Sequence, residues 1–192
     1  MSAKVREPSG KIVLQLKISL RNTDPIVWRR VLVPGAMPLD KLHLVIQAAM
    51  GWLDRHLHTF EIYGKRYGVP EPDEWDEEDA DLDEYGIRIH LLLDDDDHFI
   101  YEYDLGDNWV HDIEVESISE VDAPLLQAIC LDGARACPPE DCGGTSGFAD
   151  FVETMADVSH PERHEMVEWF GGVFDPDHFS LSDTNARIQR IR

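Results

Sequence analysis

A predicted β-hairpin at residues 101–116, with the sequence YEYDLGDNWVHDIEVE, constrains the fold of this chain more than any other stretch. Gly106, Asp107 and Asn108 are residue types that accept turn conformations, and they lie between two strand-like runs. In the second run, polar residues alternate with four others on one predicted apolar face: Trp109, His111, Ile113 and Val115. The pattern predicts two paired antiparallel strands, with His111 on the buried side.

The rest of the chain supplies further strands and then helices. Four segments have the composition or alternation of strands: 11–21, 26–33, 87–93 and 98–103. In the segment 52–63, the spacing of His56 and His58 predicts both imidazoles on the same side of a strand, a weak signal for a metal site. Residues 124–131 predict a short helical or loop piece. Four segments predict helices: 38–50, 148–158, about 161–171, and a last short one through 191 capped by Ser182 or Asp183. We expect an α+β fold, a single domain with a mostly antiparallel sheet packed with helices and a helical C-terminal part.

Two segments predict loops. Residues 134–147, ARACPPEDCGGTSG, contain prolines and glycines that argue against regular structure and favour a fixed, irregular loop. Residues 71–86 are rich in acidic side chains and predict a solvated loop. With no internal repeat and no linker, we expect one domain over 1–192 with its core at about 12–191.

Composition narrows the class of protein. The chain has 17 basic and 39 acidic residues among 192, a formal charge of −22, which argues against direct nucleic-acid binding. The sequence contains no apolar run long enough for a membrane helix and no secretory signal, so we expect a cytoplasmic protein. Three cysteines without such a signal predict reduced thiols: Cys130, Cys137 and Cys142.

The motifs of the chain resemble one known family, the plasmid pRiA4b ORF-3-like proteins of bacterial plasmids, mobile elements and genomes. The resemblance rests on IVWRR at 26–30, the helix ending at Gly51 and Trp52, YDLGDNWVH at 103–111, CPPEDCGG at 137–144, and FDP at 174–176. Leu105 and Cys142 depart from the family's usual residues. The resemblance implies an α+β domain, a possible accessory role on mobile elements, and no established activity.

The first functional hypothesis is a ligand- or protein-binding module. Its pocket would lie between the 103–111 hairpin and the 134–147 loop and would take a small molecule, a peptide or a protein. The candidate binding residues are Asp104, Asp107, Trp109, His111, Trp52 and Tyr103.

The alternative hypothesis is a metal-assisted hydrolase. Nitrogen, sulfur and carboxylate donors suit a divalent ion such as zinc, and the candidate ligands are His58, Asp107, His111 and Cys137. Glu140 or Asp141 would then act as the catalytic base. A third interpretation is purely structural, with Asp104 and Asp107 bonded to turn amides and Trp109 in the core.

Overall fold

The computed structural model of the chain describes residues 11–70 and 81–191, which form an eight-stranded sheet and four α-helices. The strand order is β5-β4-β3-β6-β7-β1-β2-β8, and every neighbouring pair is antiparallel except β4 and β5. The strands are β1 Ile12–Leu20, β2 Trp28–Pro34, β3 His58–Ile62, β4 Lys65–Gly68, β5 Leu82–Asp83, β6 His98–Tyr103, β7 Trp109–Glu120 and β8 Ile129–Ala134. The helices are α1 Leu39–Met50, α2 Gly144–Ala156, α3 Arg163–Phe170 and α4 Leu181–Ile188, with a 3-10 helix η1 at Ile89–Leu91. The predicted α+β fold is confirmed.

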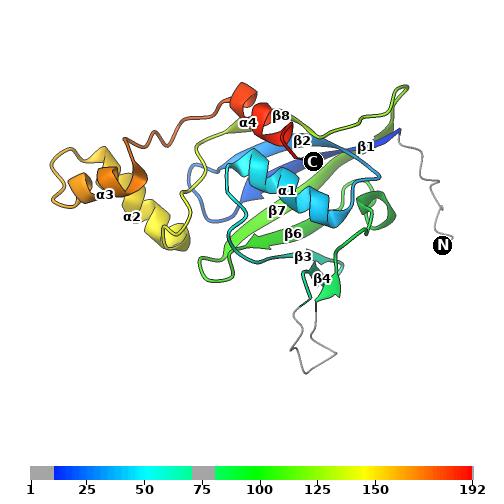
Figure 1. Ribbon diagram of the computed structural model, residues 1–192, viewed down its shortest axis with the longest axis horizontal. Helices are drawn as coiled ribbons and strands as arrows, with labels where there is room; N and C mark the ends of the chain where they lie inside the picture. Colours follow the sequence, from blue (N-terminus) through cyan, green and yellow to red (C-terminus); the bar gives the residue numbers. More distant parts are fainter. Residues whose placement is uncertain (1–10, 71–80, 192) are drawn as a thin grey trace.

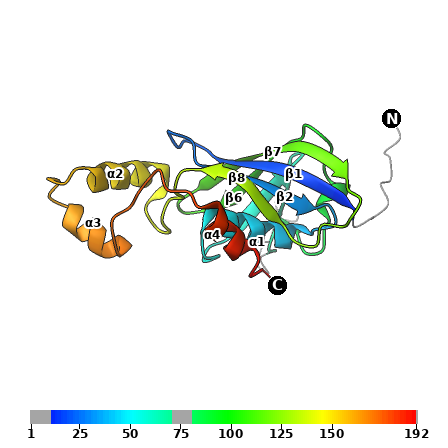
Figure 2. The ribbon, with the colours of Figure 1, turned by 90° about the horizontal axis from the view of Figure 1, so that it is seen from above.

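The main core lies between one face of the sheet and helix α1. Figures 1 and 2 show α1 and α4 on the same side of the sheet. Leu16 and Ile18 of β1 point to this side and are fully buried, as are Leu42 and Ile46 of α1. The predicted alternation of the first strand is confirmed, and burying its apolar residues against the α1 stripe stabilises the fold.

The opposite face of the sheet is polar. Glu116 of β7 accepts hydrogen bonds from Gln15 Nε2 at 2.7 Å and from Arg30 Nε at 2.7 Å, so it links β1, β2 and β7 on that face. Arg21 and Asp112 form a second ion pair there, with 2.6 Å between Nη2 and Oδ1. One apolar and one polar face are expected for an antiparallel sheet covered by helices on one side.

Helices α2 and α3 form a lobe beyond the end of the sheet, shown in yellow and orange in Figure 1. Their apolar side chains gather in a cluster separate from the main core, centred on Phe151, Met155 and Phe174. Gly171 ends α3 in a left-handed conformation with φ of 82°, as the Gly171-Gly172 stop signal predicts.

Three predicted elements differ from the structure. The predicted strand 87–93 is absent, and η1 (Ile89–Leu91) lies in its place, because Ile89 N–H donates to Met37 O at 3.0 Å and the segment packs on the connection before α1. The end of the expected helical or loop piece 124–131 belongs instead to β8 (Ile129–Ala134), which pairs with β2. The predicted loop 134–147 ends early, because α2 begins at Gly144.

The start of α4 also differs from the prediction. Its N-cap is Ser180, whose hydroxyl accepts the N–H of Asp183 at 3.2 Å, and the helix ends at Ile188. Ser182 and Asp183 were the predicted caps, and both lie inside the first turn instead. Ser180 has the extended backbone typical of an N-cap residue, which explains the shift.

Residues 71–80 of the predicted acidic loop lie outside the described residues. Within 81–86, Glu84 is only 4% exposed, so the prediction of a solvated loop is wrong for this residue. The three cysteines are free thiols, as predicted. None of the helices in the described ranges combines the length and hydropathy needed to cross a membrane.

Candidate functional site

The turn between β6 and β7 holds one carboxylate in a fixed orientation. Asp104 has a left-handed backbone with φ of 57°, and its Oδ1 accepts hydrogen bonds from Gly106 N–H at 3.0 Å and Asp107 N–H at 3.2 Å. Asn108 N–H closes the turn on Asp104 O at 2.6 Å. These bonds use Oδ1 of Asp104 and leave Oδ2 facing away from the turn amides.

The loop before α2 docks directly on this turn. Gly143 N–H donates to Asp107 Oδ2 at 3.0 Å. At Gly144 the backbones approach so closely that an added Cβ would lie 2.6 Å from Asp107 O. Trp52 adds a third link, because its indole N–H donates to Pro138 O at 3.0 Å. The hairpin and the loop, separated in sequence, therefore form one rigid corner.

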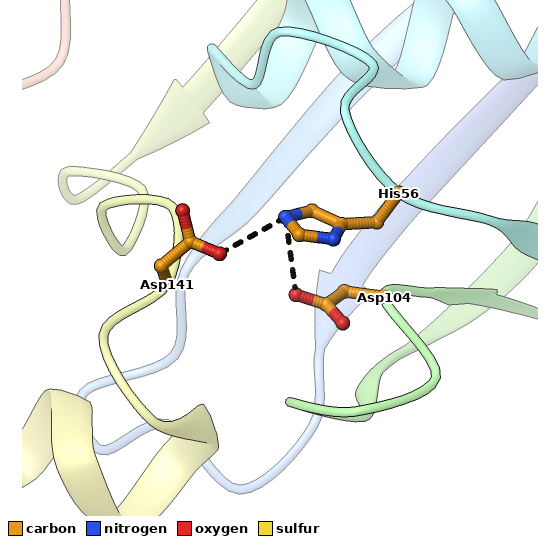
Figure 3. Close-up of side chains that lie close together, drawn as sticks. All are labelled: His56, Asp104 and Asp141. Carbon is orange, nitrogen blue, oxygen red and sulfur yellow. Dashed lines mark ion pairs between the residues drawn. The ribbon is translucent and has the colours of Figure 1, made fainter.

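His56 lies at the centre of this corner, in the segment between α1 and β3. Its Nε2 is 3.1 Å from Asp141 Oδ1, 3.5 Å from Asp104 Oδ2 and 3.9 Å from Glu140 Oε2. Figure 3 shows the imidazole between the Asp104 and Asp141 carboxylates. The Nε2 atom is buried, yet it makes no hydrogen bond of acceptable geometry.

Glu140 is the third carboxylate at the corner, and hydrogen bonds from neighbouring residues fix its position. Its Oε1 accepts the N–H of Leu53 at 2.8 Å and the hydroxyl of Tyr103 at 3.1 Å. Burial of Tyr103, together with the neighbouring carboxylate, raises the pKa of the phenol, so the hydroxyl remains a donor at neutral pH. The glutamate is thereby fixed with Oε2 towards His56.

The charges of the corner are unbalanced. Three carboxylates lie within 4 Å of one imidazole nitrogen, and a protonated imidazole supplies at most one positive charge. The Asp104 and Glu140 side chains are only 10% and 12% exposed, so their charges need compensation, whereas the Asp141 side chain is 61% exposed to solvent. A divalent cation at this position would compensate the two buried carboxylates.

The spacing of the donor atoms fits such an ion. One donor atom each of His56, Asp104 and Asp141 lies within 4.8 Å of the other two. Ligand atoms about 2.1 Å from a tetrahedral ion are separated by about 3.4 Å, close to the distances from His56 Nε2. One imidazole with two carboxylates suits zinc or a similar first-row ion.

Two of the predicted binding residues, Trp109 and His111, are fully buried in the core. The Nδ1 atom of His111 bonds to Tyr101 O at 3.2 Å, and burial lowers the pKa of this histidine to about 4. The core position of His111 follows from the strand alternation.

The predicted metal ligands do not meet at one point. His58 Nε2 pairs with Glu84 Oε2 at 3.0 Å, and its ring stacks on His43 with 3.5 Å between centroids. Asp107 bonds to the loop, and Cys137 is a half-buried residue whose thiol pKa is raised by burial. The corner brings together Asp104, Glu140 and Asp141, which were predicted, and one residue that was not.

That missed residue is His56. The sequence pattern predicted His56 and His58 on one side of a strand, but β3 begins only at His58, and the two imidazoles lie in different surroundings. The sequence singled out His56 only through its spacing from His58, so it gave no sign that His56 lies beside the hairpin and the loop.

A cavity of about 380 Å³ adjoins the loop on the side of α4. Trp52, Pro138 and Glu140 contribute to its wall, so it shares these residues with the corner. No residue of the 103–111 hairpin lines it. The cavity therefore lies beside the loop, and the cation-sized cluster lies between the loop and the hairpin.

Known proteins match almost the whole chain. The family described as Plasmid pRiA4b ORF-3-like protein matches residues 12–183. The uncharacterized protein y4hQ of Sinorhizobium fredii is 37% identical over 185 residues, covering 93% of this chain and 92% of the relative. A crystal structure of a protein of unknown function, MM3350 from Methanosarcina mazei Go1, has a TM-score of 0.80 and 33% identity, covering 90% of this chain and 97% of that one.

Proposed function

We infer that this chain, which belongs to the plasmid pRiA4b ORF-3-like family, is a ligand-binding protein whose recognition centre is a divalent cation at the corner. His56, Asp104 and Asp141 are the proposed protein ligands. Glu140 lies next to them, with its Oε2 3.9 Å from His56 Nε2. A bound ion with three protein ligands keeps a position for a donor atom from an incoming small molecule, peptide or protein.

The observation that carries this proposal is the environment of His56 Nε2. His56 Nε2 is one of five buried side-chain nitrogen or oxygen atoms without a hydrogen bond in the described part of the chain, and an unpaired buried nitrogen costs free energy. Two carboxylate oxygens nevertheless face it at 3.1 and 3.5 Å. Coordination of a cation would satisfy the nitrogen and both oxygens together, which hydrogen bonding within the corner does not.

The test is a metal titration of protein purified without an affinity tag and stripped with EDTA. We expect one equivalent of Zn²⁺ or Co²⁺ to bind, measured by calorimetry, and Co²⁺ to give the visible absorption of a low-symmetry site. His56→Gln and Asp104→Asn should each weaken binding by about 10–100-fold or more, because a ligand is lost.

Asp107→Asn is the matched control, because Asp107 lies in the same turn but outside the cluster of donor atoms. It should retain the affinity of the unmodified protein. Asn at position 104 keeps an oxygen for the two turn amides, so that variant should fold. Binding below ~0.1 equivalent, or equal losses in the control and the ligand variants, would refute the cation site.

A second candidate function, metal-assisted hydrolysis, is favoured by Glu140 alone. Its Oε2 lies 3.9 Å from His56 Nε2. Leu53 N–H donates to Oε1, and the Tyr103 hydroxyl lies within hydrogen-bond distance of both oxygens. A glutamate fixed beside a metal-bound water would take up the proton of that water. Glu140→Gln should keep the stoichiometry of Zn²⁺ but abolish hydrolysis of activated esters or phosphoesters, and equal rates in both proteins would remove this candidate.

A further inference from the structure

We propose a second binding site, for a small organic anion with an apolar body, in the cavity of about 380 Å³ between the loop and α4. The site does not depend on the cation at the corner. It rests on two arginines in the cavity wall, Arg29 and Arg187, and on the aromatic side chains around them.

Arg29 is a buried cation that has no carboxylate partner among residues 11–70 and 81–191. Only 2% of the residue is exposed, and its guanidinium donates to Ala49 O at 3.0 Å, Ala134 O at 2.9 Å and Arg135 O at 2.9 Å. A fourth bond reaches Trp28 O at 2.7 Å. All four acceptors are neutral carbonyls, and burial lowers the pKa of the guanidinium, although arginine stays charged at neutral pH.

Arg187 of α4 brings a second guanidinium to the same cavity. Its Nε donates to Ala48 O at 2.8 Å and its Nη2 to the Thr184 hydroxyl at 3.1 Å. Neither this residue nor Arg29 forms an ion pair with a carboxylate in the described part of the chain. The charge of Arg187 also lowers the pKa of Arg29, which indicates that the two cations repel each other.

The carbonyl partners do not offset this positive charge. Ala48 and Ala49 are in the last turn of α1, where the helix dipole amounts to roughly half a negative charge. Two guanidiniums therefore leave an excess of about one and a half charges. In a chain with a formal charge of −22, a pair of cations with no acidic partner indicates that their counter-ion comes from outside the chain.

Two acidic residues also line the cavity, and neither serves as that counter-ion. Glu140 directs its carboxylate to Leu53 N–H, the Tyr103 hydroxyl and His56. Asp183 is an exposed residue in the first turn of α4, where an acidic side chain interacts favourably with the helix N-terminus.

The remaining walls define the rest of the ligand. Trp52, Phe174 and Phe179 line the cavity, and Phe179 lies under the Arg29 guanidinium with 4.7 Å from Cζ to the ring centroid. Aromatic walls favour a flat apolar group, and a guanidinium favours a carboxylate or phosphate. A volume of about 380 Å³ limits the occupant to a small molecule.

The experiment compares three probes that share a phenyl group: phenylacetate, phenyl phosphate and the neutral phenylacetamide. Each is titrated into EDTA-treated protein and followed by the indole N–H signal of Trp52 in ¹H–¹⁵N spectra, so that a failed cation site does not affect the result. We expect at least one anion to bind about tenfold or more tightly than the amide, because charge-assisted hydrogen bonds are lost with the amide. The tighter of the two anions identifies the headgroup.

Arg187→Met should remove this preference for the anion, and Arg187→Lys should retain part of it. The matched control is Arg190→Met, which removes one positive charge from an exposed residue outside the cavity wall. Equal affinities for amide and acids in the unmodified protein would overturn the anion site, whether or not the Arg187 variants fold. An unchanged preference in folded Arg187→Met would overturn it as well.

Discussion

The buried histidine of the hairpin makes the stability of this protein depend on pH in a defined window. His111 has a folded-state pKa of about 4, lowered by burial from the ordinary value of 6.5. Below pH 6.5 the unfolded chain therefore binds a proton at His111, whereas the native state binds this proton only near pH 4 and below. The free energy of unfolding should fall as pH decreases through this window, by about 2 kcal/mol between pH 7.5 and 5 and about 3 kcal/mol by pH 4.

His111 affects stability at higher pH than the paired carboxylates do. Hydrogen bonds from Arg21 and Arg30 lower the pKa of Asp112 and Glu116, respectively, so their contributions are lost mainly below their ordinary values near pH 4. His43 has a pKa lowered by burial and adds to the same trend as His111. The difference in unfolding free energy between pH 7.5 and pH 5, measured by urea denaturation, therefore comes mostly from the histidines.

The comparison uses His111→Leu, which removes the titrating group but keeps an apolar side chain in the core. Its free energy of unfolding should change between the two pH values by about 2 kcal/mol less than that of the unmodified protein. His164→Leu is the control, because the His164 side chain is 83% exposed and its removal should leave the pH dependence unchanged. The same slope in His111→Leu as in the unmodified protein would refute the reasoning.

Three further predictions concern the corner between hairpin and loop. Gly144→Ala places a Cβ 2.6 Å from Asp107 O at φ of 67° and should lower the unfolding free energy by roughly 2–4 kcal/mol in urea, whereas Gly172→Ala, which meets nothing within 4 Å, should change it little. Trp52→Phe removes the indole hydrogen bond to the loop and should cost about 1–3 kcal/mol in the same assay; no change would mean that the link is unimportant. Burial raises the pKa of Cys142 to about 12, so mass spectrometry should find it alkylated far more slowly in native than in urea-unfolded protein at pH 8.

The sequence predicted the parts of the fold that depend on local periodicity. The hairpin follows from its turn residues, and Trp109 pairs with Tyr103 across it as expected. Strand β8 was missed because its burial does not alternate, and it is defined by pairing with the distant strand β2. The segment 87–93 contains η1 instead of a strand because it packs on the chain before α1, a tertiary contact with no local signature.

The candidate site was predictable only in part, for a related reason. The motif residues Asp104, Glu140 and Asp141 could be recognised as polar groups in turns and loops, where function concentrates. His56 could not, because its role depends on where the chain leaves α1 and on the docking of the loop over the hairpin. The predicted strand included His56, whereas β3 begins at His58, and His58 was predicted as the metal ligand instead.

The hydrogen bonds of the two aspartates bear on the choice between a binding role and a purely structural one. Asp104 and Asp141 both have φ of 57°, a left-handed conformation that aspartate adopts more readily than most L-residues. The turn hydrogen bonds of Asp104 compensate through Oδ1 and leave Oδ2 to face His56. The Asp141 carboxylate makes no hydrogen bond to a described backbone amide, and its contact in this region is with His56 alone. Turn hydrogen bonds thus account for one oxygen of Asp104 and for neither oxygen of the exposed Asp141, and the proposed cation would account for the orientation of both side chains.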